Sequence, residues 1–296
     1  NEALRQLPVR LLIADYTDSS KAKAMSLAMN ATADIPYDAV VIMDADNTAG
    51  TSFLSELNPV FQSGARAVQA HRTAKNTNTD IAVLDAASEE INNSIFRSGH
   101  IALGLSSALI GSGMALEACW FRQHIHLLET AGEDKEMEAL LLKQRIHIEY
   151  LEHVYVKDEK TQKKEGIKNQ RKRWIAAQFD SLVRTLPDFP KELLRGNIDY
   201  CDKVFQWTLL PRIILIFCTF FFTILVTLVS PYSSIKWWIL AFALFLALFT
   251  AIPGHLLNKQ LLRAIFQLPS LLLGIASNLF KLKGVNKKFI HTEHGN

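Results

Sequence analysis

The sequence predicts an α/β domain followed by apolar helices that are long enough to cross a membrane. Up to about residue 205, short apolar segments alternate with helical patterns, which is the order of βαβ units. From Leu209 onward the composition changes, and residues 213–229 and 237–252 carry no charged side chain. Each of these two stretches is about as long as a helix must be to cross a ~30 Å hydrocarbon layer.

The soluble part is expected to alternate strands and helices. Apolar runs typical of strands cover residues 9–16, 37–46, 65–74 and 147–161. Helical patterns cover residues 19–32, with Ser19 or Ser20 as N-cap, and residues 51–61, 81–98 and 133–146. The strand at 37–46 is continuously apolar, as in a parallel sheet that is covered on both faces. Ligands of such sheets bind at the carboxyl ends of the strands.

Two aspartates stand at the end of that strand. In "VVIMDADNTA", Asp44 and Asp46 follow the apolar run directly. Carboxylates in this position could bind a hard divalent cation, which prefers oxygen ligands and would neutralise a diphosphate. The motif is short and common, so an ordinary surface turn is the alternative.

Three further motifs are equally weak when each is taken alone. Residues 111–113 form a G-S-G turn, and Glu133 and Asp134 open a helix, where the helix dipole by itself favours acids. "QRKRW", residues 170–174, could be a basic patch at a membrane surface. Arg66, His71 and Arg72 could face a substrate cleft, but a plain surface role is favoured for them.

The order of these motifs resembles the family-2 glycosyltransferases. A strand ending in D-x-D is followed by G-S-G, then by G-E-D before a helix, then by Q-x-x-R-W and an apolar hairpin. This order is similar to that of the membrane-integrated branch, which includes cellulose, chitin and hyaluronan synthases and ceramide glucosyltransferase. The resemblance extends from about Leu11 to the C-terminus. It implies an inverting enzyme with a GT-A, Rossmann-like fold.

The resemblance also implies roles for the matching residues. Asp44 would lie near the nucleotide, and Asp46 would coordinate Mg²⁺ or Mn²⁺ on the diphosphate. Asp134, beside Glu133, matches the catalytic base that deprotonates the acceptor hydroxyl. The remaining residues that match substrate-binding positions are Lys21, Gly111, Ser112, Gly113, Gln170, Arg173 and Trp174. The implied partners are a nucleotide-sugar donor, a glycan or lipid acceptor and membrane lipids, and a second copy of the chain is a further candidate.

Two departures from the family pattern bear on this interpretation. The opening strand of the family, which helps to hold the nucleotide base, has no counterpart before Asn1, so the catalytic domain is expected to be truncated at its N-terminus. Gly132 stands where a threonine is commoner, in G-E-D rather than T-E-D. The retained Asp134 makes this second departure tolerable.

The apolar half predicts an integral membrane protein, with a buried hairpin of a soluble protein as the alternative. Aromatic residues that suit the headgroup region flank the two apolar stretches at Trp207, Tyr232, Trp237 and Trp238. Lysines and arginines lie mainly outside the turn between the spans, so the positive-inside rule places the catalytic domain in the cytoplasm. A third apolar stretch, residues 261–282, is expected to be a re-entrant or interfacial helix, and a third membrane span is the next alternative.

These observations divide the chain into four expected parts. They are a partial catalytic domain over residues 1–185, an interfacial segment over 186–208, a transmembrane hairpin over 209–257, and the third apolar segment with its basic tail over 258–296. A net charge of +3 is too small to indicate nucleic-acid binding. The three cysteines have neither pairing nor metal spacing.

Three functions are compatible with the sequence. The first is an inverting glycosyltransferase that uses a nucleoside diphosphate sugar, such as a UDP-sugar, for polysaccharide synthesis or for a single transfer to a lipid. The second is a non-catalytic membrane scaffold or sugar-nucleotide sensor that keeps the fold. The third is a nucleotidyl- or phosphotransferase. An acidic base followed by Q-x-x-R-W favours the first.

Overall fold

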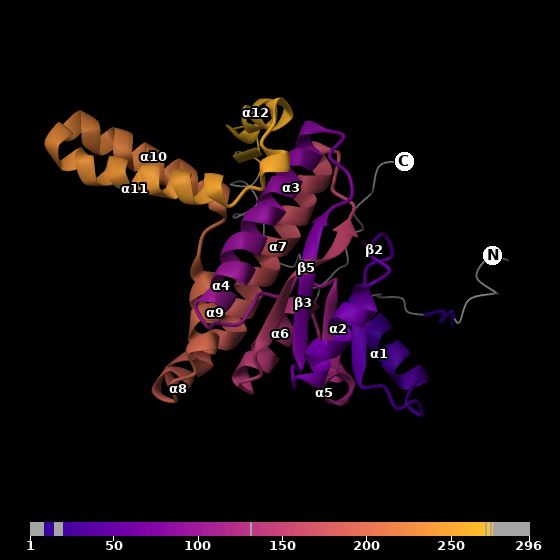
Figure 1. Cartoon of the computed structure of the whole chain (residues 1–296). Coiled ribbons are helices and arrows are strands. Elements are labelled where there is room, and N and C mark those ends of the chain that lie inside the picture. Colours follow the sequence, from indigo (N-terminus) through magenta and orange to yellow (C-terminus); the bar gives the residue numbers. More distant parts are fainter. Residues whose placement is uncertain (1–8, 15–19, 131, 270, 273, 275–296) are drawn as a thin grey trace.

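A five-stranded mixed sheet forms the centre of the computed structural model (Figure 1). The structure describes residues 9–14, 20–130, 132–269, 271, 272 and 274. The strands are β1 (Ala39–Ile42), β2 (Thr48–Ala49), β3 (Ala67–Ala74), β4 (Met114–Glu117) and β5 (Ile148–Asp158), in the order β1-β4-β3-β5-β2. β3 and β5 pair in parallel, and the other neighbours pair antiparallel.

Helices surround this sheet and extend beyond it. They are α1 (Lys21–Ala31), α2 (Phe53–Gln62), α3 (Asp80–Asn93), α4 (Gly99–Ala102), α5 (Ala118–His124), α6 (Glu133–Lys143), α7 (Lys164–Thr185), α8 (Phe189–Leu194), α9 (Ile198–Thr208), α10 (Arg212–Val229), α11 (Pro231–Thr250) and α12 (Lys259–Ile265). The Ser20 hydroxyl caps α1 by accepting from Lys23 N at 3.2 Å, as the sequence suggested. Thr79 caps α3 in the same way through Ala82 N.

The core lies on both faces of the sheet because side chains alternate along each strand. In β4, Met114 and Leu116 belong to one apolar cluster, while Ala115 belongs to the other. The first cluster is completed by helices α1, α5, α6 and α9, and the second by α2. The α/β class predicted from the sequence is confirmed.

The sheet differs from the prediction in its strand directions. β4 is inserted between β1 and β3 and runs against both, so β1 is an edge strand with an antiparallel neighbour. The expectation of a parallel strand covered on both faces is wrong for β1, whose residues are mostly half-buried. β1, β3 and β5 nevertheless run in one direction, which brings their carboxyl ends to the same side of the sheet.

The strand expected over residues 9–16 is not found in residues 9–14, the described part of that segment. Val9, Leu11 and Ile13 are 56%, 81% and 85% exposed. A strand needs a neighbour for its N–H and C=O groups. Within the described residues, none of the sheet strands pairs with this segment.

Helix α9 belongs to the core of the α/β domain, although residues 186–208 were expected to lie along a membrane surface. Tyr200 and Val204 are 2% exposed and join the same apolar cluster as the sheet. The Tyr200 hydroxyl donates to Thr185 O, at the end of α7, at 3.0 Å. Trp207 is 6% exposed, so it is not the open headgroup anchor that the sequence suggested.

Helices α10 and α11 form a hairpin that projects from the domain (Figure 1). Both are long and apolar enough to cross a membrane. Of the most apolar 18 residues of each helix, only 6% in α10 and 11% in α11 are buried within the protein. The two helices approach through small side chains, among which Thr223 and Ala241 are 0% and 1% exposed. This low burial argues against the core hairpin of a soluble protein.

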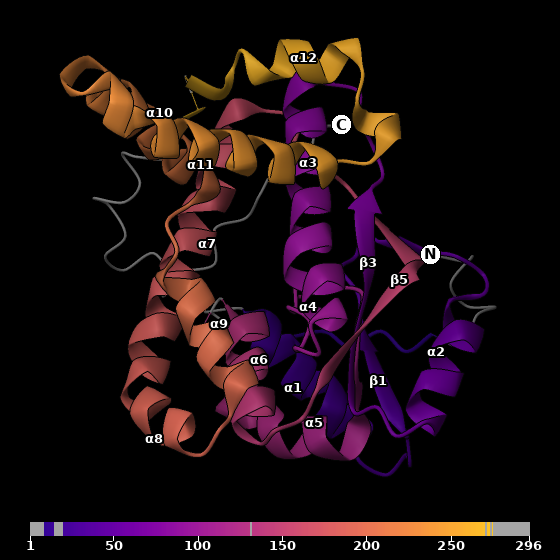
Figure 2. The same cartoon turned by 60° about the vertical axis from the view of Figure 1, so that its left-hand side comes forward.

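The described part of the third apolar segment packs on the α/β domain. Leu261 of α12 and Leu256 before it contact Val83 and Ala87 of α3, and Figure 2 shows α12 across the end of that helix. Leu271 packs with Ile81 of α3 and Ile167 of α7. Residues 275–282 lie outside the described residues, so the choice between re-entrant helix and third span remains a prediction.

Gly132 allows α6 and α7 to approach closely, which gives the G-E-D departure a packing reason. A Cβ atom added at Gly132 would lie 2.7 Å from Ala177 Cβ of α7, so the helices would have to separate.

We expect Gly132→Ala to lower the free energy of unfolding by about 1–3 kcal/mol through this overpacking. Ala177→Gly alone should lower the free energy of unfolding by roughly 1 kcal/mol, because it places a glycine inside a helix. The double variant should lose less free energy of unfolding than the two single variants lose together. Chemical denaturation of the four proteins in detergent measures the coupling. Additive effects would contradict the close contact.

Candidate active site

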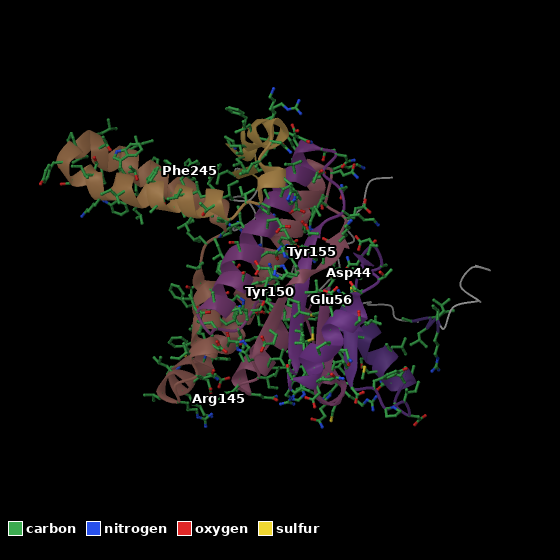
Figure 3. All side chains as sticks on the ribbon, viewed as in Figure 1. Asp44, Glu56, Arg145, Tyr150, Tyr155 and Phe245 are labelled. Carbon is green, nitrogen blue, oxygen red and sulfur yellow. The ribbon has the colours of Figure 1, made fainter. Side chains whose placement is uncertain are left out.

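One cavity of about 1750 Å³ extends from the sheet to the base of the hairpin. Figure 3 labels Asp44 beside the sheet and Phe245 on the hairpin, and both line this cavity. The predicted residues that line it are Lys21, Asp44, Asp46, Gly111, Glu133, Asp134, Gln170, Arg173 and Trp174. They come from α1, the turn after β1, the loop before β4, and helices α6 and α7. The fold therefore gathers these separate motifs around one space.

Lys21 connects the first two of these segments. The Ser20 cap starts α1 at Lys21, and the Lys21 ammonium forms an ion pair with Asp44 and donates to Gly111 O at 2.6 Å. The side chains of Lys21 and Asp44 are 24% and 39% exposed, so the pair remains accessible from the cavity. Charge and hydrogen bonding thus fix the D-x-D turn against the G-S-G turn.

The glycine turn brings this pair next to the acids of α6. Gly111 has a φ of +79°, which favours glycine, and a Cβ there would lie 3.7 Å from Glu133 Oε1 and 3.8 Å from Asp134 Oδ2. Ser112 and Gly113 do not line the cavity. Ser112 is fully buried, and Gly113, at φ +64°, packs against Val156. These two residues support the turn rather than face a ligand.

The two acids of α6 have different surroundings. Glu133 is 7% exposed, and burial, followed by the adjacent Asp134 carboxylate, raises the pKa of Glu133 to about 7. Asp134 is half-buried, and its Oδ1 accepts from Lys135 N at 2.9 Å. Asp134 is therefore the more accessible of the two carboxylates, and it is the one that the resemblance implies as catalytic base.

Helix α7 presents the Q-x-x-R-W side chains to the cavity. Gln170 Oε1 is buried and has no hydrogen-bond partner among the described residues, so it can accept from a ligand. Burial lowers the pKa of Arg173, while the carboxylates of Glu133, Asp44 and Asp134 oppose that shift. The guanidinium thus lies close enough to these acids for their charges to stabilise it.

Arg171, which belongs to the basic patch that the sequence suggested for residues 170–174, has structural contacts within the protein. Its Nη2 donates to Asp85 Oδ1 of α3 at 2.9 Å, and its guanidinium carbon lies 4.7 Å from the centre of the Trp174 ring. One face of Trp174 is therefore covered by a cation. A sugar stacking on Trp174 would need the opposite face.

A buried ion network in the wall of the cavity was missed by the sequence interpretation. Arg72, taken as a surface residue, is 8% exposed and donates to both oxygens of Glu89, at 3.3 and 3.0 Å. Lys160 Nζ also contacts Glu89 at 2.8 Å and Asp158 Oδ2 at 2.9 Å. Burial would raise the pKa of Glu89, but the positive charges of Arg72, Lys160 and Arg97 hold it far below its usual value. The only signal in the sequence was a charged residue inside the alternating β3 pattern.

This network supports the walls of the cavity. Arg72 Nη1 donates to Ile110 O and Ser112 Oγ of the glycine turn, each at 3.3 Å. Arg66 and His71, by contrast, pair with Glu117 and Glu90 outside the cavity.

A family model for glycosyl transferase family group 2 matches residues 39–250, more than two thirds of the chain. The chain belongs to this family. The matched span contains the D-x-D, G-E-D and Q-x-x-R-W motifs and the hairpin, whereas Lys21 lies before it. No curated protein matches the chain.

The protein is therefore a glycosyltransferase, and its family generally uses a divalent metal ion. Within the described residues there is no group of three or more His, Cys, Asp or Glu side chains that could hold a metal ion by themselves. The site nevertheless fits Mg²⁺ or Mn²⁺, because Asp46 supplies a hard carboxylate ligand to the cavity. Mg²⁺ commonly combines one or two carboxylates with substrate phosphates and water.

The raised pKa of Glu133 predicts how the stability of this glycosyltransferase depends on pH. The folded protein binds the Glu133 proton more tightly than the unfolded chain, whose glutamate has a pKa of 4.5, so the stabilisation is complete below pH 4.5 and is lost as the pH rises through about 7. At ~1.36 kcal/mol per pH unit, the difference amounts to roughly 3 kcal/mol. Glu133→Gln should remove this decline, which denaturation at several pH values would measure. An equally steep decline in the variant would contradict the assignment.

The buried network makes a second prediction. Glu89→Gln leaves Arg72 and Lys160 buried beside a neutral side chain, so we expect it to lower the free energy of unfolding by about 3–5 kcal/mol. Glu117→Gln is the matched control, because the side chains of its pair with Arg66 are 47% (Arg66) and 35% (Glu117) exposed and such pairs contribute less than about 1 kcal/mol. Denaturation curves of both variants provide the comparison. A similar loss in both would show that burial of the pair has no effect.

Proposed function

We propose that the protein is an inverting, metal-dependent glycosyltransferase that moves a sugar from a nucleoside diphosphate, such as UDP, to a hydroxyl of a glycan or lipid. The observation that carries the proposal is the single cavity lined by Asp46, Asp134 and Arg173, which come from three separate parts of the chain. A scaffold or sensor has no chemical need for a carboxylate base, a cation site and an arginine together. A phosphotransferase would not need a base followed by Q-x-x-R-W.

The donor would bind through its diphosphate. Asp46, with Asp44 beside it, would hold Mg²⁺ or Mn²⁺, which neutralises negative charge on the leaving diphosphate. Arg173 offers a planar guanidinium suited to phosphate oxygens. Because the leaving group gains charge in the transition state, a fixed cation and a fixed arginine stabilise that state more than the ground state. Gln170 Oε1 would accept a hydrogen bond from a substrate hydroxyl or amide.

Asp134 would act as the general base. It would take the proton of the acceptor hydroxyl while that oxygen attacks the anomeric carbon from the side opposite the diphosphate, which inverts the configuration. An aspartate is a weak base, so position matters more than a shifted pKa. Protonation of Glu133 near pH 7 limits the negative charge next to Asp134.

The cavity also suggests where the acceptor lies. Beyond the polar residues it continues to apolar side chains of the hairpin, which include Phe220, Leu244, Phe245 and Leu248. If α10 and α11 cross the membrane, an acceptor could extend from Asp134 towards the bilayer. This arrangement supports transfer at a membrane face, either to a lipid acceptor or to a growing polysaccharide, and the positive-inside rule favours the cytoplasmic face.

The base assignment predicts the behaviour of Asp134→Asn. We expect turnover to fall by at least about 10²–10⁴-fold, because proton transfer is lost, while donor binding is largely retained. The full-length protein in membranes would be supplied with a panel of UDP- and GDP-sugars, with the products analysed by mass spectrometry and donor binding measured separately. Asp180→Asn, on α7 outside the cavity, is the control. Normal turnover in Asp134→Asn would refute the assignment.

A further inference from the structure

The residue after the D-x-D motif closes the turn that carries both aspartates. Asn47 N donates to Asp44 O at 3.0 Å, and Asn47 Oδ1 accepts from Asp44 N at 3.2 Å. These two bonds link the backbone of Asp44 to Asn47 in both directions, so the backbone on either side of Ala45 and Asp46 is fixed.

The amide group of Asn47 also joins two carboxylates. Its Nδ2 donates to Asp46 Oδ1 at 3.3 Å and to Asp158 Oδ1 at 3.0 Å. Asp158 ends β5 and is 111 positions away in the sequence, but β2 and β5 pair at Thr48–Lys157 and Ala49–Val156, directly beside these residues. The sheet therefore sets the distance between Asn47 and Asp158.

Asp158 is itself held firmly. Its Oδ2 lies 2.9 Å from Lys160 Nζ and 3.8 Å from Arg72 Nε, and Lys160 is only 2% exposed. Both cations are in turn bound by Glu89. The buried network thus fixes one oxygen of Asp158 and directs the other to Asn47.

We propose that Asn47 and Asp158 are positioning residues that orient the Asp46 carboxylate for the divalent cation. This inference rests on the proposed metal role of Asp46. The two aspartates of D-x-D are then held by different means, since Asp44 pairs with the Lys21 ammonium. The hydrogen bond from the Asn47 amide fixes the direction in which the Asp46 carboxylate presents its oxygens to a cation.

The experiment measures Mn²⁺ binding by EPR to the full-length protein, with saturating UDP and no sugar donor, so that the readout is independent of turnover. Loss of a hydrogen bond that orients a metal ligand typically weakens affinity about 10–100-fold. We expect such a loss in Asn47→Ala and Asp158→Ala. Asp158→Asn should lose less, because it keeps an oxygen that can accept from Asn47.

Two reference variants complete the design. Asn78→Ala removes another loop asparagine, whose amide bonds to Gln162, and should bind Mn²⁺ as the parent does. Asp46→Ala should bind Mn²⁺ weakly. Equal affinity in Asp46→Ala and the parent would overturn the proposed cation role together with this inference, whereas equal affinity in Asn47→Ala and the parent, with loss in Asp46→Ala, would overturn the inference alone.

Thermal unfolding separates positioning from folding. If Asn47→Ala leaves the unfolding midpoint unchanged, its weaker Mn²⁺ binding supports the positioning role. If the midpoint falls, the two Asp158 variants decide, since both remove the charge but only Asp158→Asn retains the oxygen that Asn47 contacts. Equal loss of Mn²⁺ affinity in these two variants would then overturn the inference.

Discussion

The architecture of the site depends on the burial of Glu89 between Arg72 and Lys160. One carboxylate on α3 binds a cation from β3 and a cation from the segment after β5, so it joins three elements that are distant in sequence. A buried charge is tolerated only when it is paired and hydrogen-bonded, which leaves these side chains few alternative arrangements. These fixed side chains hold two parts of the cavity wall in place.

On one side, Arg72 reaches the glycine turn, and on the other, Lys160 reaches Asp158 beside the D-x-D motif. The residues that are expected to contact substrate are therefore supported by a buried ion network in the wall of the same cavity. Such support matters because an electrostatic site is effective only when its charges are oriented before the substrate arrives. Buried ion pairs add little net stability, so we attribute the role of this network mainly to positioning.

The same cavity connects polar chemistry with an apolar hairpin. Aspartates and arginines line the part near the sheet, and phenylalanines and leucines line the part near α10 and α11. The family match covers both regions, which is consistent with a glycosyltransferase whose catalytic and apolar parts form one unit. Helix α9 strengthens this connection, because it packs in the core of the domain and leads directly into α10.

The sequence by itself determined the α/β class, the positions of helices α1, α2, α3 and α6, the two long apolar helices and the family resemblance. These features are local, since they depend on periodicity, capping residues such as Ser20 and uncharged stretches, and neighbouring residues are enough to produce them. Most motifs that were singled out also line one cavity, although no local rule placed Asp46 and Asp134 around the same space.

Only the tertiary structure decided the strand directions, the position of Trp207 and the burial of Arg72. The apolar residues of β1 are compatible with a parallel or an antiparallel neighbour, so they do not predict the strand direction. In the same way, the sequence does not show whether Arg72 in a strand faces water or Glu89. Pairing partners, long-range ion pairs and burial depend on residues far apart in the chain, which come together only when the whole domain packs. For this reason Asn47 and Asp158, 111 positions apart, could be connected to the D-x-D motif only in three dimensions.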